Sequence, residues 1–323
     1  MIVVAGEALI DLVPSPQNPP LAGQLPALLP RRGGGPYNTA VALGRLGSRA
    51  AFCSRVSHDA FGEALLDGLR SGGVDTSLVQ RGDEPTTLAM ADISPDGSAG
   101  YGFYVDGTAD RLFTLPPALP DGTRALSLGT CSLVLEPGAS AYEALLRRES
   151  RRGVFTTLDP NIRAGLIADP AAYRTRFHSW LPDLALLKLS EEDALWLAGG
   201  EPGSGGASGA RDKITAAARS WLAAGPAAIV LTRGGDGLTV LSPGGEVTVP
   251  GERVEVVDTI GAGDTVNAAL LHRLGSHDAL SYAAVASLGP DDWRDILGYA
   301  ARAAAITCSR AGAEPPFAAE LAA

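Results

Sequence analysis

The residues with the clearest chemical potential lie at positions 258–264, which read Asp-Thr-Ile-Gly-Ala-Gly-Asp and run directly into the apolar segment 265–271. Two glycines around one alanine allow a tight turn before a helix, and the first amides of a helix have no partner inside it. Such amides, with the helix dipole, favour a bound anion. Asp264 could then accept a proton from a hydroxyl held beside that anion, which is the chemistry of phosphoryl transfer to an alcohol. In isolation, the same Asp would be only a helix cap.

A second glycine-rich segment, residues 33–36 (Gly-Gly-Gly-Pro), precedes a predicted helix over residues 37–46. Proline is well suited to a first helical turn. Consecutive glycines let the backbone approach a small ligand closely, and the Asn38 amide offers a donor and an acceptor to a polyol. The alternative is a plain helix-entry loop that binds nothing.

These two segments resemble the two signatures of the ribokinase-like (PfkB) carbohydrate kinases, and further segments extend the resemblance over nearly the whole chain. The resemblance implies that Asp264 removes the proton from a primary hydroxyl of a sugar. It also implies that the backbone of Gly261, Ala262 and Gly263 stabilises the transferring phosphoryl group.

The resemblance further implies a sugar site built from distant segments. Asp11 ends a Gly-Glu-x-x-x-Asp segment just after the predicted strand 2–5, and Arg163 ends the segment Asp-Pro-Asn-Ile-Arg. Taken alone, Asp11 would be a solvated loop residue, and Phe103 could either stack on a sugar or pack in a dimer contact. The expected sugar-binding residues are Asp11, Gly34, Gly35, Asn38, Phe103 and Arg163.

Other segments correspond to nucleotide and metal sites of the family. The expected nucleotide-binding residues are Lys188, Thr232, Gly234, Gly237 and Asn267. Ser190 and Asp193 match, with shorter side chains, an Asn-x-x-Glu element that organises Mg²⁺ through water, although a helix cap would explain both equally well. Asp258 and the carbonyl of Ile260 correspond to a monovalent cation site, for which K⁺ is the candidate. The resemblance therefore implies ATP and Mg²⁺ as cofactors.

Short apolar runs alternate with helical segments along the chain, which predicts an α/β fold with a mostly parallel central sheet flanked by helices. The resemblance implies the three-layer ribokinase-like form of this fold, as one domain over residues 1–323. Residues 12–32 and 84–112 interrupt the alternation, and the second contains two extended runs around a Pro-Asp-Gly turn. We expect them to form a small discontinuous β lid over the sugar, which is also the candidate surface for a homodimer. The glycine-rich residues 201–209 predict a loop.

Composition excludes several classes of protein. A net charge of −10 argues against nucleic acid or an anionic membrane surface as the main partner. The three cysteines and four histidines have no spacing typical of a metal site or a disulfide framework. No apolar run approaches the length needed to cross a bilayer, and residues 1–5 lack the basic region that is typical of a secretory leader. A cytoplasmic enzyme is the expectation.

The segments Gly-Thr-Ala-Asp (107–110), Leu-Glu-Pro (135–137) and Asp-Pro-Asn-Ile-Arg (159–163) resemble the fructokinase-like branch, so fructose is the expected substrate. Val105 and Asp106 stand where many relatives that act on sugar acids carry an Arg. A 2-keto-3-deoxygluconate kinase, a ribokinase and a nucleoside kinase remain alternatives within the family. A non-catalytic sugar sensor on the same scaffold is an alternative of another class. A dinucleotide-dependent oxidoreductase is disfavoured, because no strand is followed by Gly-x-Gly-x-x-Gly.

Overall fold

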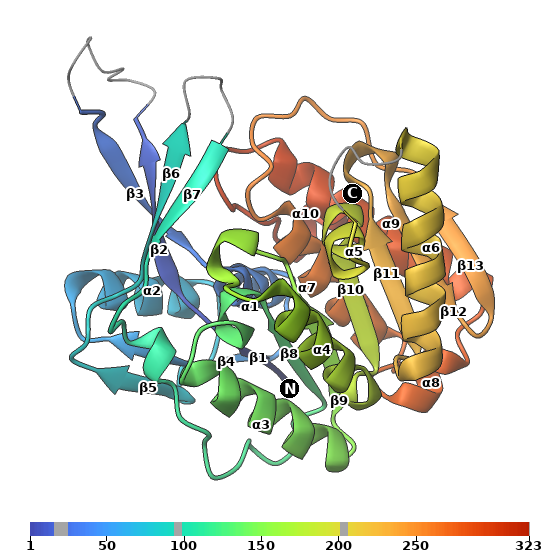
Figure 1. The fold of residues 1–323 in the computed structure, drawn as a ribbon, viewed down its shortest axis with the longest axis horizontal. Helices are drawn as coiled ribbons and strands as arrows, with labels where there is room; N and C mark the ends of the chain where they lie inside the picture. Colours follow the sequence, from blue (N-terminus) through green and yellow to red (C-terminus); the bar gives the residue numbers. More distant parts are fainter. Residues whose placement is uncertain (16–24, 94–98, 201–205, 323) are drawn as a thin grey trace.

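The computed structural model describes residues 1–15, 25–93, 99–200 and 206–322. Within these ranges, a nine-stranded sheet forms the centre of the molecule, in the order β13-β12-β11-β10-β9-β8-β1-β4-β5 (Figure 1). Its strands are β1 (Ile2–Ala5), β4 (Ala50–Ser57), β5 (Val79–Gly82), β8 (Ala125–Gly129), β9 (Phe155–Asp159), β10 (Leu186–Ser190), β11 (Ala228–Thr232), β12 (Leu238–Ser242) and β13 (Gly245–Val249).

The strands from β5 to β11 run parallel, whereas β12 and β13 are antiparallel and close one edge. Parallel strands are covered on both faces, which is why β1, β8 and β9 are buried along their whole length. Ligands in such sheets bind beyond the carboxyl ends of the strands. The expectation of a mostly parallel sheet is confirmed.

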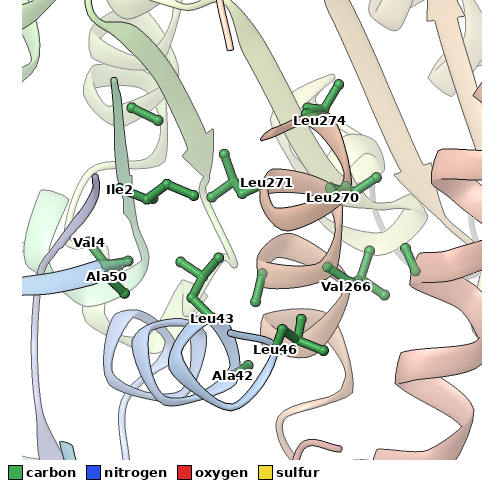
Figure 2. Packing of buried hydrophobic residues seen from close by; sticks show 14 of the residues in the cluster. Ile2, Val4, Ala42, Leu43, Leu46, Ala50, Val266, Leu270, Leu271 and Leu274 are labelled. Atoms are coloured by element: carbon green, nitrogen blue, oxygen red, sulfur yellow. The ribbon is translucent and has the colours of Figure 1, made fainter. Parts of the chain in front are cut away.

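Helices cover the sheet on both faces, which makes three layers. The first face carries α1 (Gly35–Arg45), α2 (Ala60–Ser71), α7 (Ala262–Ser276) and α9 (Pro290–Cys308), and the second carries α3 (Gly138–Arg151), α4 (Pro170–Trp180), α5 (Glu191–Leu197) and α6 (Gly206–Ala224). Two short helices, α8 (Tyr282–Ala286) and α10 (Ala318–Leu321), complete the chain. Figure 2 shows side chains of α1 and α7, such as Leu43 and Leu271, packed together near Ile2 of the sheet.

A second sheet of four strands, in the order β3-β2-β6-β7, projects from one end of the molecule (Figure 1). Its strands are β2 (Leu9–Pro14), β3 (Leu28–Gly33), β6 (Leu88–Ile93) and β7 (Ala99–Tyr104). The antiparallel pairing of β6 with β7 confirms the predicted hairpin, whose Pro-Asp-Gly turn lies outside the described residues. This sheet corresponds to the two segments expected to form a lid.

Two local expectations were wrong. Asp11 is not in a loop after a strand, because β2 begins at Leu9 and Asp11 pairs with Arg31 and Ala89 inside the small sheet. The loop expected over 201–209 is shorter, since α6 already begins at Gly206. Among the described residues, none of the helices combines the length and the apolar character that crossing a bilayer would require.

Candidate active site

Helix α7 begins at the carboxyl edge of the large sheet with a glycine turn. Gly261 has a φ of 76°, which favours glycine, and a Cβ there would lie 2.6 Å from the Cβ of Ala313. The amide of Ala262 donates to the carbonyl of Thr259, so it is not free as the sequence suggested. Within the described parts of the chain, the amides of Gly261, Gly263 and Asp264 have no backbone acceptor. Those of Gly263 and Asp264 lie in the first turn of α7 and are the two donors that an anion would meet at this helix start. A phosphoryl contact of the Gly261 amide remains a prediction.

The carboxylate of Asp264 lies directly beside that helix start and is 7% exposed. Its Oδ2 accepts a hydrogen bond of 2.8 Å from the Nδ2 of Asn38, which comes from α1 at the other end of the chain. Burial raises the pKa of Asp264 to about 6, although the Asn38 hydrogen bond opposes the shift. A Cβ at Gly35 would lie 3.2 Å from Oδ1 of Asp264, so the glycine leaves this oxygen accessible to a small group. The expected meeting of Asp264, Asn38 and Gly35 is observed.

A buried ion pair lies next to the start of α7. The Nζ of Lys188 in β10 is 2.6 Å from Oδ2 of Asp159 in β9, and both side chains are nearly inaccessible. A Cβ at Gly263 would lie 3.1 Å from Nζ of Lys188, so the ammonium group borders the two amides described above. Burial raises the pKa of Asp159, and Lys188 opposes this shift. A fixed positive charge beside free amides suits a transferring phosphoryl group.

Asp11 and Arg163 line the side of the site that faces the small sheet. Burial raises the pKa of Asp11 to about 6, and the charge of Arg163 opposes the shift. The guanidinium of Arg163 donates to Oδ1 of Asn161 over 2.7 Å, and Asn161 has the unusual φ of 39°. A Cβ at Gly35 would lie 3.3 Å from Nδ2 of Asn161, which places this amide near Asp264 as well.

The glycine segment before α1 is constrained by close contacts. A Cβ at Gly33 would lie 1.9 Å from Oδ2 of Asp11, so a larger residue there would displace the Asp11 side chain, which the sequence did not reveal. Gly34 has a φ of 105°, and a Cβ would lie 2.8 Å from the carbonyl oxygen of Glu7. The backbone conformation at Gly34 therefore favours glycine by itself, and a ligand that approaches this backbone closely would favour glycine for the same reason.

Phe103 shares a face of the small sheet with Asp11, because Asp11 pairs with Ala89 and Ala89 pairs with Phe103 in the strand register. Its side chain is half-buried, whereas Tyr104 on the opposite face is 57% exposed. The register therefore places Phe103 on the same face as Asp11, and contact of either residue with a sugar remains a prediction.

The expected nucleotide turn follows β11. Gly234 has a φ of 54° and begins the 3-10 turn Gly234–Asp236, and Gly237 has a φ of 98°. A Cβ at Gly237 would lie 2.1 Å from the carbonyl oxygen of Val249, so packing against β13 already requires glycine. Thr232 ends β11 beside Ser190 in the register, at the same edge of the sheet as Lys188. Contact with a nucleotide remains a prediction for these residues.

Ser190 and Asp193 form the helix cap that the sequence offered as the simpler explanation. The Ser190 hydroxyl accepts from the amide of Asp193, and Oδ2 of Asp193 accepts from the Ser190 amide and hydroxyl. Oδ1 of Asp193 accepts a hydrogen bond of 2.8 Å from the amide of Ile162. Both carboxylate oxygens are therefore engaged, and only Oδ1, which accepts a single hydrogen bond, keeps a lone pair for a water molecule.

Asp258 joins two segments of the C-terminal region. Its Oδ1 accepts from the amide of Ile260 over 3.0 Å, and its Oδ2 accepts from the amide of Gly312 over 2.8 Å. The loop around Gly312 is thereby held against the turn at Gly261. Coordination of an ion by Asp258 and Ile260 remains a prediction.

The sequence did not reveal Glu7 and Thr130 as parts of this region. Glu7 is 2% exposed and accepts from the Thr130 hydroxyl and, over 3.0 Å, from the Ser132 amide. Burial raises the pKa of Glu7 to about 7. Thr130 has a φ of 59°, an arrangement that costs energy for a β-branched residue and often occurs at functional sites. The position of Glu7 directly after β1, at the carboxyl edge of the sheet, was the available signal.

Asn267 lies deeper than a direct contact with a nucleotide requires. It is 3% exposed, and its amide donates to Ser127 of β8 over 3.1 Å. Contact of Asn267 with a nucleotide remains a prediction.

Comparison with known proteins agrees with this geometry. Residues 1–319 match the pfkB family carbohydrate kinases. The chain belongs to this family. It is 39% identical over 303 residues to a fructokinase of Rhizobium leguminosarum bv. trifolii, a match that covers 91% of this chain and 88% of the relative. A fructokinase of Klebsiella pneumoniae is 31% identical over 90% of this chain and 89% of its own length.

Solved structures support the same assignment. The crystal structure of a fructokinase from Xylella fastidiosa with bound ATP has a TM-score of 0.86 and 25% identity, and the match covers 99% of this chain and 96% of that one. A fructokinase from Vibrio cholerae O395, in a form with fructose, ADP and calcium ion bound, has a TM-score of 0.79 and 25% identity, covering 99% and 97%. The fold is therefore ribokinase-like, and the protein is a carbohydrate kinase.

Proposed function

We propose that this kinase transfers the γ-phosphoryl group of ATP to a primary hydroxyl of fructose, giving fructose 6-phosphate. The observation that carries the proposal is the buried Asp264 beside two free amides at the start of α7, within reach of Asn38. A carboxylate in this position is a base for the hydroxyl, and the amides are donors for the phosphoryl oxygens.

Each step uses residues described above. Asp264 takes the proton of the attacking hydroxyl through Oδ1, because Oδ2 is held by Asn38. The amides of Gly263 and Asp264 and the ammonium of Lys188 stabilise the negative charge of the phosphoryl group. Asp11, Asn38 and Arg163 orient the sugar hydroxyls, with Gly34 and Gly35 leaving room for the sugar and Phe103 covering it.

The nucleotide is proposed to lie along the carboxyl ends of β10 and β11, with Thr232, Gly234 and Gly237 at its ribose and phosphates. Mg²⁺ neutralises charge on the phosphates of ATP when it is bound. Ser190 and Asp193 would contact that ion through water. Their oxygens already take part in hydrogen bonds, which disfavours direct ligation. A monovalent cation such as K⁺ would use Asp258 and the carbonyl of Ile260.

Two further points belong to the proposal. The small sheet is proposed to act as a lid over the sugar, because it carries Asp11 and Phe103 on one face. The exposed Tyr104 on the other face is available for a homodimer contact. We place the enzyme in the cytoplasm, where ATP is abundant.

Fructose is favoured by the names of the two relatives and by the three segments that resemble the fructokinase-like branch. Val105 and Asp106 supply no positive charge for the carboxylate of a sugar acid. The test is ADP release with Mg·ATP on fructose, glucose, ribose, 2-keto-3-deoxygluconate and adenosine. We expect the highest kcat/KM with fructose. If another of these compounds gave a higher kcat/KM, it would replace fructose as the proposed substrate. If a sugar bound but none of the compounds caused ADP release, the protein would instead be a sugar sensor.

A further inference from the structure

A small polar cavity lies beside the catalytic carboxylate. Its volume is about 10 Å³, which is close to the space that one water molecule needs. The polar residues that line it are Thr39, Ser127, Thr130, Asp159, Asp264 and Asn267. It therefore connects the floor of the site, at β8 and β9, with the first two turns of α7.

Two buried acceptors belong to residues that line this cavity. Oδ1 of Asp159 and Oδ1 of Asn267 have no hydrogen-bond partner within the described residues, although the other polar atom of each side chain is bonded. Asp159 is 4% exposed and Asn267 is 3% exposed. A buried acceptor without a donor costs about 1–3 kcal/mol, so two such atoms at one cavity call for a donor.

The strand register brings a third such group close to them. Ser127 and Thr157 are direct neighbours in β8 and β9, and Asp159 follows two residues later on the same face. The hydroxyl of Thr157 is also buried and has no partner among the described residues. Unpaired polar atoms are thus concentrated on one face of β9, beneath α7.

We propose that one resident water molecule occupies this cavity, donates to Asp159 and to Asn267, and thereby fixes Asp159 so that Lys188 stays beside the phosphoryl-binding amides. A water molecule matches the site because it supplies two donors to two acceptors and can accept from the Ser127 hydroxyl. The second half of the proposal, which concerns Lys188, rests on the proposed function.

The water completes a chain of contacts from Ser127 through Asn267 and Asp159 to Lys188. Lys188 touches Asp159 through Oδ2 alone, and this carboxylate could rotate if its other oxygen were unheld. A rotation would move the ammonium away from Gly263, where the phosphoryl charge develops. Asp159 and Asn267 are positioning residues in this arrangement, since neither is proposed to touch the substrate.

The first test is a crystal structure of the ligand-free protein at a resolution that shows ordered water. We expect a full-occupancy peak at hydrogen-bond distance from Oδ1 of Asp159 and Oδ1 of Asn267. An absent peak, or a different side-chain placement that pairs the two oxygens directly, would overturn the proposal. This result does not depend on which sugar is phosphorylated, so it is separate from a failure of the proposed function.

The second test compares Asn267→Leu, which removes the acceptor at similar volume, with the control Thr307→Val. Thr307 lies in α9 and is hydrogen-bonded to Thr265 of α7, the helix that also carries Asn267, but it does not line the cavity. We expect the water peak to be absent in Asn267→Leu. Its kcat should be lower by about 10- to 100-fold, while its KM for the sugar stays within about threefold of the unaltered enzyme. We expect the control to keep kcat.

Unchanged kcat in Asn267→Leu, or an equal loss in both variants, would refute a positioning role. If Asn267→Leu fails to fold, Thr157→Val and Asn267→Ser replace it, because each changes one polar side chain near the proposed water. Both are judged by the water peak and by kcat. A smaller active fraction would also lower the apparent kcat without changing KM, so kcat is calculated for each variant per folded molecule, with the folded fraction measured by circular dichroism.

Discussion

Asp264 and Asp11 are both carboxylates whose pKa burial raises to about 6, yet they stand on different supports. Asp264 lies in the first turn of α7, which packs against α1, α9 and the large sheet, and the groups around it are fixed by buried hydrogen bonds and an ion pair. Asp11 lies in the small four-stranded sheet that projects beyond the three layers (Figure 1).

This difference suggests a division of roles between the two regions. The large sheet with α7 holds the groups that must be accurately placed for the reaction, because rigid elements keep a geometry best. The small sheet carries Asp11 and Phe103, the groups that we propose recognise the sugar. Substitutions on the first region should mainly change kcat, and substitutions on the second should mainly change KM.

The largest effect is expected for Asp264→Asn. Loss of the base should lower kcat by about 10²–10⁴-fold, while binding of fructose, measured by calorimetry, stays nearly unchanged. Asp83→Asn, at a carboxylate that is 99% exposed, is the control and should keep full turnover. Unchanged turnover in Asp264→Asn would show that Asp264 is not the base. The proposed division of roles between the large sheet and the small sheet would then be wrong.

A smaller effect of the opposite kind is expected for Asp11→Asn. The substitution keeps the shape but removes the charge that accepts from sugar hydroxyls, so the KM for fructose should rise by about 10- to 100-fold through the loss of charge-assisted hydrogen bonds. Steady-state kinetics should show kcat within about threefold of the unaltered enzyme. A loss confined to kcat would show that the small sheet takes part in the chemical step.

The pH dependence separates Asn38 from its neighbour Thr39. The Asn38 hydrogen bond lowers the pKa of Asp264, so Asn38→Ala should raise that pKa, and the acid limb of kcat/KM, near pH 6, should move to higher pH by about one unit. Thr39 donates to the backbone carbonyl of Asp264 instead of its carboxylate. The limb should therefore stay in place in Thr39→Val, and a shift in both variants or in neither would contradict the assignment.

Much of the large-sheet region could be predicted from the sequence because it depends on local patterns. Buried strands are short apolar runs, and the glycine turn before α7 is visible as Gly-Ala-Gly. The meeting of Asp264 with Asn38 was predicted through a family resemblance, since 226 residues separate them and no local pattern joins them.

The remaining features depend on which strands become neighbours. The pair of Lys188 with Asp159 follows from β9 lying next to β10, and the row of Asp11 with Phe103 follows from β2 pairing with β6. Glu7 and Thr130 are hydrogen-bonded although 123 residues separate them in the sequence. Thr130 also has a positive φ, which the propensity of a β-branched residue does not predict. Local composition was also misleading in one place. The glycine-rich residues 201–209 predicted a loop, but α6 begins at Gly206, so the end of this segment is helical.

The smallest effect concerns the stability of the large-sheet region in the absence of substrate. A buried carboxyl whose pKa is raised to about 6 destabilises the folded state at higher pH, because the unfolded chain ionises it more easily. Asp264→Asn should therefore raise the free energy of unfolding by roughly 1–3 kcal/mol at pH 8, seen as a Tm higher by about 2–5 °C. The gain should shrink as pH falls from 6 towards 4, where Asp264 becomes protonated in the folded state and its penalty disappears. Asp83→Asn should show no gain, and a lower Tm in Asp264→Asn would mean that its contacts with Asn38 and Lys188 outweigh the cost of burying the charge.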